Sequence, residues 1–375
     1  MKISIIEANM TGWQHVPINS HIINIISSIF PTEDIHLFCS KEHYNNLDIN
    51  RDKIKYENIT IVSNKKQRIK KFFLEYRQTL TILKRNNSDL FILLSCYPNV
   101  QVFLTILLKH NKNKKVILIT HGEMEGLRLK GKWKFWSYPF WVFLCTLINP
   151  STNFTRIVLG ENIANNMKKY KNFQNVLSLN HPLQICDTKY ISPTKYNNVF
   201  AFIGTCLVSK GGNTIVSSAL SLNKNSNSYF EIIGTYDEQL ENKTDNIHFA
   251  TKKGIFLEKN DYQTFVKNIT YACLPYPKDS YKYTASGSLL DAIAFLKPII
   301  YIGNDYFDCI FKDAGDVGYR CENEEDFIKQ VLFLDETPDL QRYEKQVLNL
   351  QKLRETLSIK QIETDFKNIL VTKLL

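Results

Sequence analysis

The chain has 375 residues, of which 44% are hydrophobic and 22% are charged, and this length favours two globular domains. The composition excludes a disordered or fibrous protein, and no apolar run approaches the roughly 20 residues that a membrane-spanning helix needs. The net charge of +10 is unevenly distributed, because residues 1–185 hold 25 Lys and Arg against 12 Asp and Glu. The first half of the chain therefore predicts an anionic partner.

The first half alternates short apolar runs with segments of helical spacing. Strands are expected at 2–6, 35–39, 59–62, 90–95, 116–120 and 156–159, and helices at 18–29, 69–83, 100–110 and 161–169. Such an alternation predicts a parallel sheet with helices on both faces.

The composition turns polar over residues 186–198, which we interpret as a linker between domains of residues 1–185 and 199–340. The pattern then restarts, with strands expected at 199–203, 229–233, 271–274 and 298–302 and helices at 212–222, 287–295, 324–334 and from about 338 to the end. The expected fold class is α/β, with two tandem Rossmann-like doubly wound domains. Ligands of such sheets bind at the carboxyl ends of the strands, so we expect the site in the cleft between the domains.

Two stretches of the second domain have the residue types of a phosphate site. In the first, a strand ends at Gly204, and Lys210-Gly211-Gly212 opens a helix. Glycine permits close approach of the backbone to a phosphate, the helix N-terminus offers free N–H groups, and Lys210 adds a positive charge. The alternative is an ordinary strand–turn–helix connection with a solvated lysine.

In the second stretch, Ser286, Gly287 and Ser288 stand at the start of a helix, where they can hydrogen-bond an anion. Asp291 lies about one turn further along, on a face that could meet a ribose. The alternative is an N-capped core helix in which Asp291 only complements the helix dipole.

The order and separation of the two stretches resemble the nucleotide-sugar domain of GT-B glycosyltransferases, most closely the family-4 group, over roughly residues 199–335. That group has a Glu, seven residues, and a second Glu followed by Ala and a Gly-Lys-Pro strand. Asp291-Ala292 and Lys297-Pro298 stand in the later places, and Tyr283 stands where the first Glu falls. The resemblance implies that Asp291 contacts the ribose and that Tyr283 lies on the sugar side. It also implies that the segment 341–375 packs back toward the first domain.

Thr205 stands where the group usually has an Arg, which leaves Lys210 as the cation of that loop. In the first domain, His121 follows the strand 116–120. The resemblance implies that His121 lies near the reacting sugar, which makes it the candidate catalytic residue. Glu123, close by, could handle an acceptor hydroxyl.

The loop after the first strand holds Gly12, Trp13 and His15, which the resemblance implies reach the acceptor and the diphosphate. A cap and hydrophobic staple around Trp13 is the alternative.

Two segments mix cations with aromatic residues and carry the excess positive charge of the first half. Their members are Lys65, Lys66, Arg68, Lys70 and Lys71, and then Arg128, Lys130, Lys132, Trp133, Lys134 and Trp136. Such mixtures suit the surface of an anionic membrane, where each cation is worth about 1 kcal/mol. A solvated basic face beside an aromatic core is the alternative.

These observations predict a metal-independent glycosyltransferase, without a cofactor, that moves a sugar from a nucleotide-sugar donor to a lipid-linked saccharide in bacterial surface polysaccharide assembly. The eight cysteines form no CxxC motif and no signal peptide precedes the first strand, so we expect a cytoplasmic protein on the inner face of the cell membrane. Two alternatives remain: a GT-B-fold nucleotide-sugar epimerase, and a non-catalytic protein that binds lipid or nucleic acid. The absence of a nucleic-acid-binding signature argues against nucleic acid.

Overall fold

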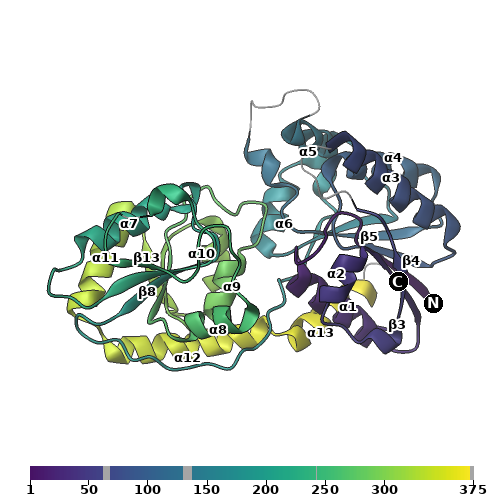
Figure 1. Cartoon of the computed structure of the whole chain (residues 1–375). Helices are drawn as coiled ribbons and strands as arrows, with labels where there is room; N and C mark the ends of the chain where they lie inside the picture. Colours follow the sequence, from purple (N-terminus) through teal and green to yellow (C-terminus); the bar gives the residue numbers. More distant parts are fainter. Residues whose placement is uncertain (62–67, 130–136, 242, 372–375) are drawn as a thin grey trace. The chain divides into compact units, whose positions relative to one another are not determined.

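The computed structural model describes residues 1–61, 68–129, 137–241 and 243–371, and the chain divides into two compact units (Figure 1). Unit 1 comprises Met1–Pro182, Lys282–Ala285 and Ile359–Leu375, and unit 2 comprises Leu183–Tyr281 and Ser286–Ser358. Each unit is built around one parallel sheet with helices on both faces, as the alternation of apolar runs predicts.

The sheet of unit 1 has the strand order β3-β2-β1-β4-β5-β6-β7. Its strands are β1 (Lys2–Ile6), β2 (Asp34–Cys39), β3 (Ile54–Asn58), β4 (Leu90–Leu93), β5 (Lys115–Thr120), β6 (Phe154–Val158) and β7 (Leu177–Ser178). Its helices are α1 (Val16–Ile29), α2 (Lys41–Asn46), α3 (Arg68–Arg85), α4 (Pro98–His110), α5 (Tyr138–Leu147), α6 (Glu161–Lys168) and α13 (Ile359–Ile369). One face of the sheet packs on α1 and α13, and the other packs on α3 and α4.

The sheet of unit 2 has the strand order β10-β9-β8-β11-β12-β13. Its strands are β8 (Val199–Ile203), β9 (Tyr229–Ile233), β10 (Ile247–Phe249), β11 (Tyr271–Leu274), β12 (Ile299–Ile302) and β13 (Gly318–Cys321). Its helices are α7 (Gly212–Ser221), α8 (Lys259–Lys267), α9 (Gly287–Ala294), α10 (Asp305–Phe311), α11 (Glu324–Glu336) and α12 (Leu340–Thr356). Short 3-10 helices occur in the connections of both units, at η1 (Arg51–Lys53), η3 (Glu125–Arg128), η4 (Lys171–Phe173), η5 (Val208–Lys210) and η6 (Glu238–Leu240).

Two of the elements expected from the sequence take a different form in the structure. The strand expected at 59–62 lies instead at β3, an edge strand whose exposed charged residues hide its pattern. The long final helix is broken into α12 and α13, because Ser358 leaves the helix to form a β-bridge with Leu183.

In each sheet the chain first adds strands on one side of its first strand and then adds the later strands on the other side. The change of side falls between β1 and β4 in unit 1 and between β8 and β11 in unit 2. The loops that leave the carboxyl ends of neighbouring strands diverge at such a point and leave room for a ligand. The candidate site residues of unit 2 lie in or directly after the loops that follow β8 and β11. Those of unit 1 lie in the loop that follows β1 and at the end of β5, the strand next to β4.

Candidate functional site

In unit 2, the end of β8 lies directly beside the start of α9. Gly204 has φ +90°, and a Cβ built on it would lie 2.6 Å from the hydroxyl oxygen of Ser288. Glycine adopts this φ readily, whereas other residues rarely do. Two residues 84 positions apart in the sequence, Gly204 and Ser288, are thereby brought together at the carboxyl edge of the sheet.

The Lys210-Gly211 turn lies at the same edge, against the end of β11. Gly211 has φ +87°, and a Cβ there would lie 2.1 Å from the carbonyl oxygen of Pro275. Lys210 is half-buried, and its ammonium group has no ion pair within the described residues. The start of α7 is less open than the sequence suggests, since the N–H of Gly212 donates to Leu207 O at 2.9 Å and the N–H of Thr214 donates to Gly211 O at 3.0 Å.

The start of α9 offers backbone donors instead. Ser286 Oγ caps this helix by accepting from the N–H of Leu289 at 3.3 Å. In the described part of the chain, the N–H groups of Gly287 and Ser288 have no acceptor. Gly287 is exposed, its φ is not positive, and a Cβ there would meet no described atom within 4 Å. Neither conformation nor packing requires glycine at 287, and the open space in front of it faces free N–H groups.

Asp291 lies one turn into α9 and is hydrogen-bonded to Tyr262 of α8. The Tyr262 hydroxyl donates to Asp291 Oδ2 at 2.5 Å. Burial raises the pKa of Asp291 to about 6, and the hydrogen bond from Tyr262 opposes this rise. Asp291 Oδ1 has no hydrogen-bond partner within the described residues and is available to a ligand hydroxyl. Sequence reasoning missed Tyr262, which lies 29 positions away and belongs to no recognisable motif.

Tyr283 is part of the other unit. The segment Lys282–Ala285 belongs to unit 1, where the Tyr283 ring is buried in a hydrophobic cluster with Met124 and Trp141. The N–H of Tyr283 donates to Glu125 Oε2 at 3.1 Å. The aromatic ring is therefore part of a core.

In unit 1, a buried carboxylate organises the loop after β1. Glu7 accepts hydrogen bonds from the N–H groups of Asn9 and Met10, each at 3.0 Å, and from the hydroxyl of Ser95 at 2.6 Å. Sequence reasoning missed this role, because Ser95 is 88 positions away. The loop then passes through Gly12, whose φ is +56°, and leaves Trp13 73% exposed.

His121 is buried at the end of β5, next to His15. Its Nε2 lies 2.7 Å from the carbonyl oxygen of Leu94, which can only accept, so Nε2 carries a hydrogen. Burial, together with nearby His15 and His181, holds the pKa of His121 well below its usual value. The ring is therefore neutral at pH 7, and Nδ1 is left as an acceptor. The rings of His15 and His121 meet edge to face, with centroids 4.6 Å apart.

Glu123 holds the backbone of His121 in place. Its Oε2 accepts from the N–H of His121 at 2.7 Å, and its Oε1 is buried without a hydrogen-bond partner in the described residues. Burial raises the pKa of Glu123 to about 7, close to neutral pH.

The basic segments are only partly described, because Lys65, Lys66, Lys130, Lys132, Trp133, Lys134 and Trp136 lie outside the described residues, as does the side chain of Arg68. Lys70 is exposed on α3. Lys71 points inward, where its ammonium donates to Asn9 O and to the hydroxyl of Tyr97, each at 3.3 Å. Arg128 forms an ion pair with Glu125 at 2.5 Å. Of the three cations with described side chains, Lys71 and Arg128 thus have partners within the protein.

The described residues contain no group of three or more His, Cys, Asp or Glu side chains placed to hold a metal ion. Among them, no helix combines the length and the apolar character needed to cross a membrane.

No protein-family model and no curated protein matches the chain. Solved structures do match it. The Anabaena protein HepE in complex with UDP-glucose aligns with a TM-score of 0.68 at 11% identity, over 99% of this chain and 100% of that one. The apo form of the lipopolysaccharide outer core galactosyltransferase WaaB aligns with a TM-score of 0.64 at 14% identity, over 100% of both chains.

A variant of S. aureus TarM, in complex with Fondaparinux, alpha-GlcNAc-glycerol and UDP, aligns with a TM-score of 0.66 at 13% identity. This match covers 98% of the present chain and 99% of TarM. Both sheets are thus included in each of the three alignments, which confirms the fold class predicted from the sequence. The chain has the two-domain GT-B fold over essentially its full length.

Proposed function

We propose that the protein is a glycosyltransferase that takes its sugar from a nucleotide diphosphate, with UDP as the nucleotide. The observation that carries the proposal is the start of α9, where the free N–H groups of Gly287 and Ser288 lie beside Gly204. Free N–H groups and the helix dipole together stabilise phosphate at such a position. The choice of UDP is supported by HepE and TarM, which have the same fold and were solved with UDP-glucose and with UDP.

The donor would be held by three parts of unit 2. The N-terminus of α9 binds the diphosphate, and Lys210 adds a cation at the same edge of the sheet. Asp291, held by Tyr262, accepts from a ribose hydroxyl through Oδ1.

Transfer breaks the bond between the sugar and the diphosphate, and negative charge grows on the departing diphosphate. Donors fixed in place before the reaction stabilise this charge without reorganising, which is why Lys210 and the start of α9 can do the work that other transferases give to a metal ion. We assign metal-independent catalysis to the chain on this basis.

Unit 1 would supply the groups that meet the reacting sugar and the acceptor. The neutral ring of His121 can accept a hydrogen bond from a sugar hydroxyl through Nδ1. Glu123 has a pKa of about 7, which suits a base that takes a proton from the acceptor hydroxyl. Gly12, Trp13 and His15 lie on the adjoining loop.

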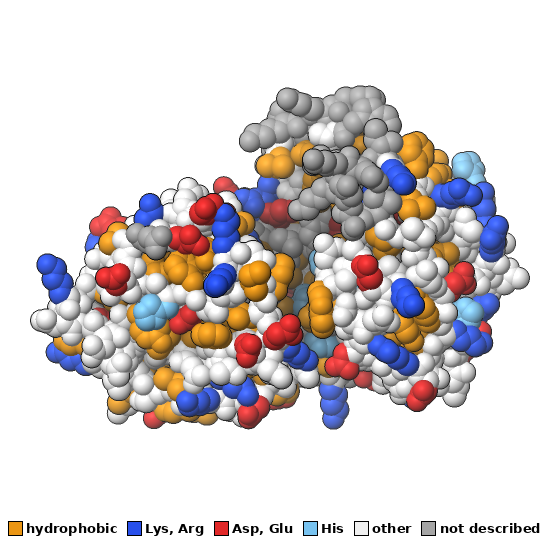
Figure 2. Space-filling model, in the orientation of Figure 1, with side chains coloured by type: hydrophobic (Ala, Val, Ile, Leu, Met, Phe, Trp, Pro, Cys, Tyr) orange, Lys and Arg blue, Asp and Glu red, His pale blue; other side chains and the backbone are white. Residues whose placement is uncertain are grey.

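We propose a lipid-linked saccharide at the inner face of the cell membrane as the acceptor. On unit 1, Phe73 of α3 is 61% exposed close in sequence to the exposed Lys70, and Leu147 at the end of α5 is 58% exposed. Hydrophobic and basic side chains occur together on the described surface (Figure 2). Apolar groups beside cations favour an anionic lipid surface. The lipopolysaccharide substrate named for WaaB also supports this class of acceptor.

Thermal unfolding of the full chain in the presence of UDP, GDP, CMP and dTDP tests the donor site. A ligand at 100 times its dissociation constant stabilises the folded state by about 2.7 kcal/mol. We expect UDP alone to give a clear rise in the unfolding temperature. Lys210→Ala should abolish most of this rise.

The matched control is Lys224→Ala, which removes an exposed lysine in the turn after α7. This variant should respond to UDP as the wild type does. A chain that no nucleotide stabilises, or a Lys210→Ala variant that responds normally, would refute the proposed donor site.

A further inference from the structure

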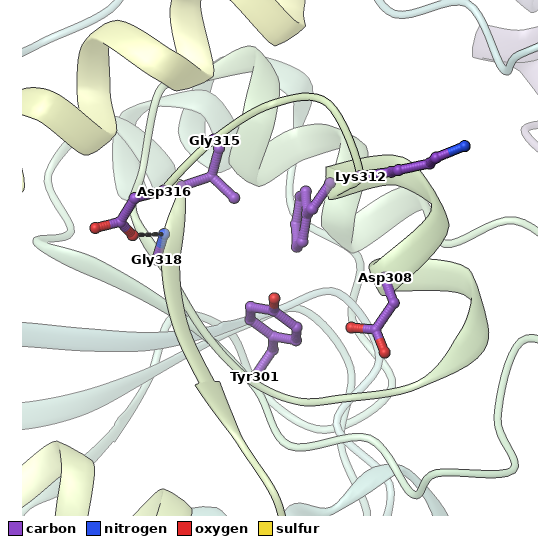
Figure 3. A pocket seen from close by; sticks show the side chains of 8 residues that line it. Tyr301, Asp308, Lys312, Gly315, Asp316 and Gly318 are labelled. Atoms are coloured by element: carbon purple, nitrogen blue, oxygen red, sulfur yellow. Dashed lines mark hydrogen bonds between the residues drawn. The ribbon is translucent and has the colours of Figure 1, made fainter.

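Unit 2 has a cavity of about 310 Å³ beneath α10, at the edge of the sheet (Figure 3). Its walls include Tyr301 of β12, Phe311 at the end of α10, and Val317 and Gly318 at the start of β13. Gly318 pairs with Ile299, the first residue of β12, so this wall lies at the amino ends of the strands. The donor residues Gly204 and Ser288 lie at the carboxyl ends, and the cavity is therefore separate from them.

Tyr301 presents an unused hydroxyl to this cavity. The residue is 7% exposed, and its ring is fixed by an edge contact with Phe311, with ring centroids 5.2 Å apart. The hydroxyl points into the cavity and has no hydrogen-bond partner among the described residues (Figure 3). Burial raises the pKa of Tyr301 to about 12, so this group stays neutral and can both donate and accept.

Two carboxylates line the cavity, and each is already paired with an arginine. Asp308 receives two hydrogen bonds from Arg320, at 3.0 and 3.1 Å. Asp316 receives two from Arg342, at 2.8 and 3.5 Å, and its Oδ1 also accepts from Gln346 at 3.0 Å and from the N–H of Gly318 at 3.3 Å. The ion pairs offset the charge of the two carboxylates, and Asp308 keeps lone pairs that can still accept. Lys312 extends away from Tyr301 (Figure 3).

These features select one class of ligand. Because each carboxylate is paired with an arginine, the cavity presents neither an unpaired negative charge nor an unpaired positive charge, and a neutral ligand suits it better than an ion. A neutral ring rich in hydroxyls can donate to Asp308, exchange a hydrogen bond with Tyr301 and lay its C–H face on Phe311. The volume is at the lower end of the roughly 300–1,000 Å³ typical of ligand sites, which suits one or two sugar rings. We propose that this cavity binds a sugar unit of a neutral saccharide, independently of the donor site.

The proposal goes beyond the proposed function, because none of these residues contributes to donor binding. It is tested by titrating the full chain, saturated with UDP, with glucose, galactose, N-acetylglucosamine and their disaccharides, followed by saturation-transfer NMR and calorimetry. Tyr301→Phe removes the hydroxyl and keeps the ring. Loss of one hydrogen bond should weaken binding of the best sugar roughly three- to tenfold.

Tyr319→Phe is the matched control, since Tyr319 is buried on the neighbouring strand β13 and its hydroxyl has no partner in the described residues and does not line the cavity. This variant should bind sugar as the wild type does. The proposal is overturned if no sugar binds, if Tyr301→Phe binds as tightly as the wild type, or if a cationic probe such as benzylamine binds this cavity more tightly than any sugar. Binding of UDP and its dependence on Lys210 are measured separately, so failure of the donor proposal would be recognised on its own.

Discussion

Positions 211 and 287 of the candidate donor site both hold glycine, but the physical reason differs between them. At Gly211, a φ of +87° and the carbonyl oxygen of Pro275, 2.1 Å from where a Cβ would stand, exclude every other residue. At Gly287, no described atom would lie within 4 Å of a Cβ. The protein itself needs a glycine at 211, whereas at 287 a bound ligand would be what requires it.

Replacing each glycine by alanine distinguishes a requirement of the fold, seen in the free energy of unfolding, from a requirement of ligand binding, seen in the affinity for UDP-glucose. Gly287→Ala should change the free energy of unfolding by no more than about 0.5 kcal/mol, because the site is exposed and helical. The same change should weaken UDP-glucose binding at least tenfold in calorimetry, since the methyl group fills the space of the diphosphate. Gly211→Ala should instead lower the free energy of unfolding by roughly 2–4 kcal/mol. A Gly287→Ala variant with normal UDP-glucose affinity would show that the diphosphate does not approach α9.

At the scale of elements, the hydrogen bond between Tyr262 and Asp291 joins α8 to α9. It favours the ionised form of a carboxyl group whose pKa burial raises to about 6. In Tyr262→Phe the carboxylate loses this donor, and the pKa of Asp291 rises further. If the ionised form accepts from the ribose, donor affinity falls as the pH drops through the pKa of Asp291, and this fall should begin at a higher pH in the variant.

The measurement is the dissociation constant of UDP between pH 5 and pH 8. Tyr319→Phe again serves as the control, because it removes a buried tyrosine hydroxyl that has no partner in the described residues. Identical pH profiles for the wild type and Tyr262→Phe would exclude Asp291 as the ribose ligand.

The central strands were predictable because they are buried on both faces. All residues of β4, β11 and β12 are buried, and such strands appear in the sequence as unbroken apolar runs. The edge strands β10 and β13, and the helices α8 and α10 beside them, were missed. These elements are only three to nine residues long and mix buried with exposed or partly exposed residues, which is too short for a reliable pattern.

The candidate site was predictable where its residues stand close together in sequence, as in the run from Ser286 to Asp291. The partners that hold these residues were not predictable. Glu7 and Tyr262 act through contacts 88 and 29 positions away. The role of Lys297 was not predictable from the sequence either. Its buried ammonium donates to the carbonyl oxygens of Lys189, Lys267 and Ile269, and its place in a Lys-Pro motif does not indicate these contacts.

At the scale of the whole molecule, the chain passes between the two units at four points, and its last helix returns to unit 1. Ile362 and Phe366 of α13, together with Leu370 directly after it, are fully buried in the core that includes Ile22 and Ile26 of α1. The hydroxyl of Ser28 donates to Glu363 at 2.6 Å and joins the same two helices. The core of unit 1 is therefore completed by the final residues of the chain.

Phe366→Ala should consequently destabilise unit 1 by about 3–5 kcal/mol, the usual cost of removing a buried phenylalanine side chain. Lys367→Ala, which changes the exposed neighbour, should have an effect within about 0.5 kcal/mol. Hydrogen exchange of the full chain in urea would report the two units separately. Peptides of the sheet of unit 1 should lose protection in Phe366→Ala, whereas those of unit 2 keep it and UDP still binds. Equal loss of protection in both units would instead mean that α13 supports the two sheets as one cooperative structure.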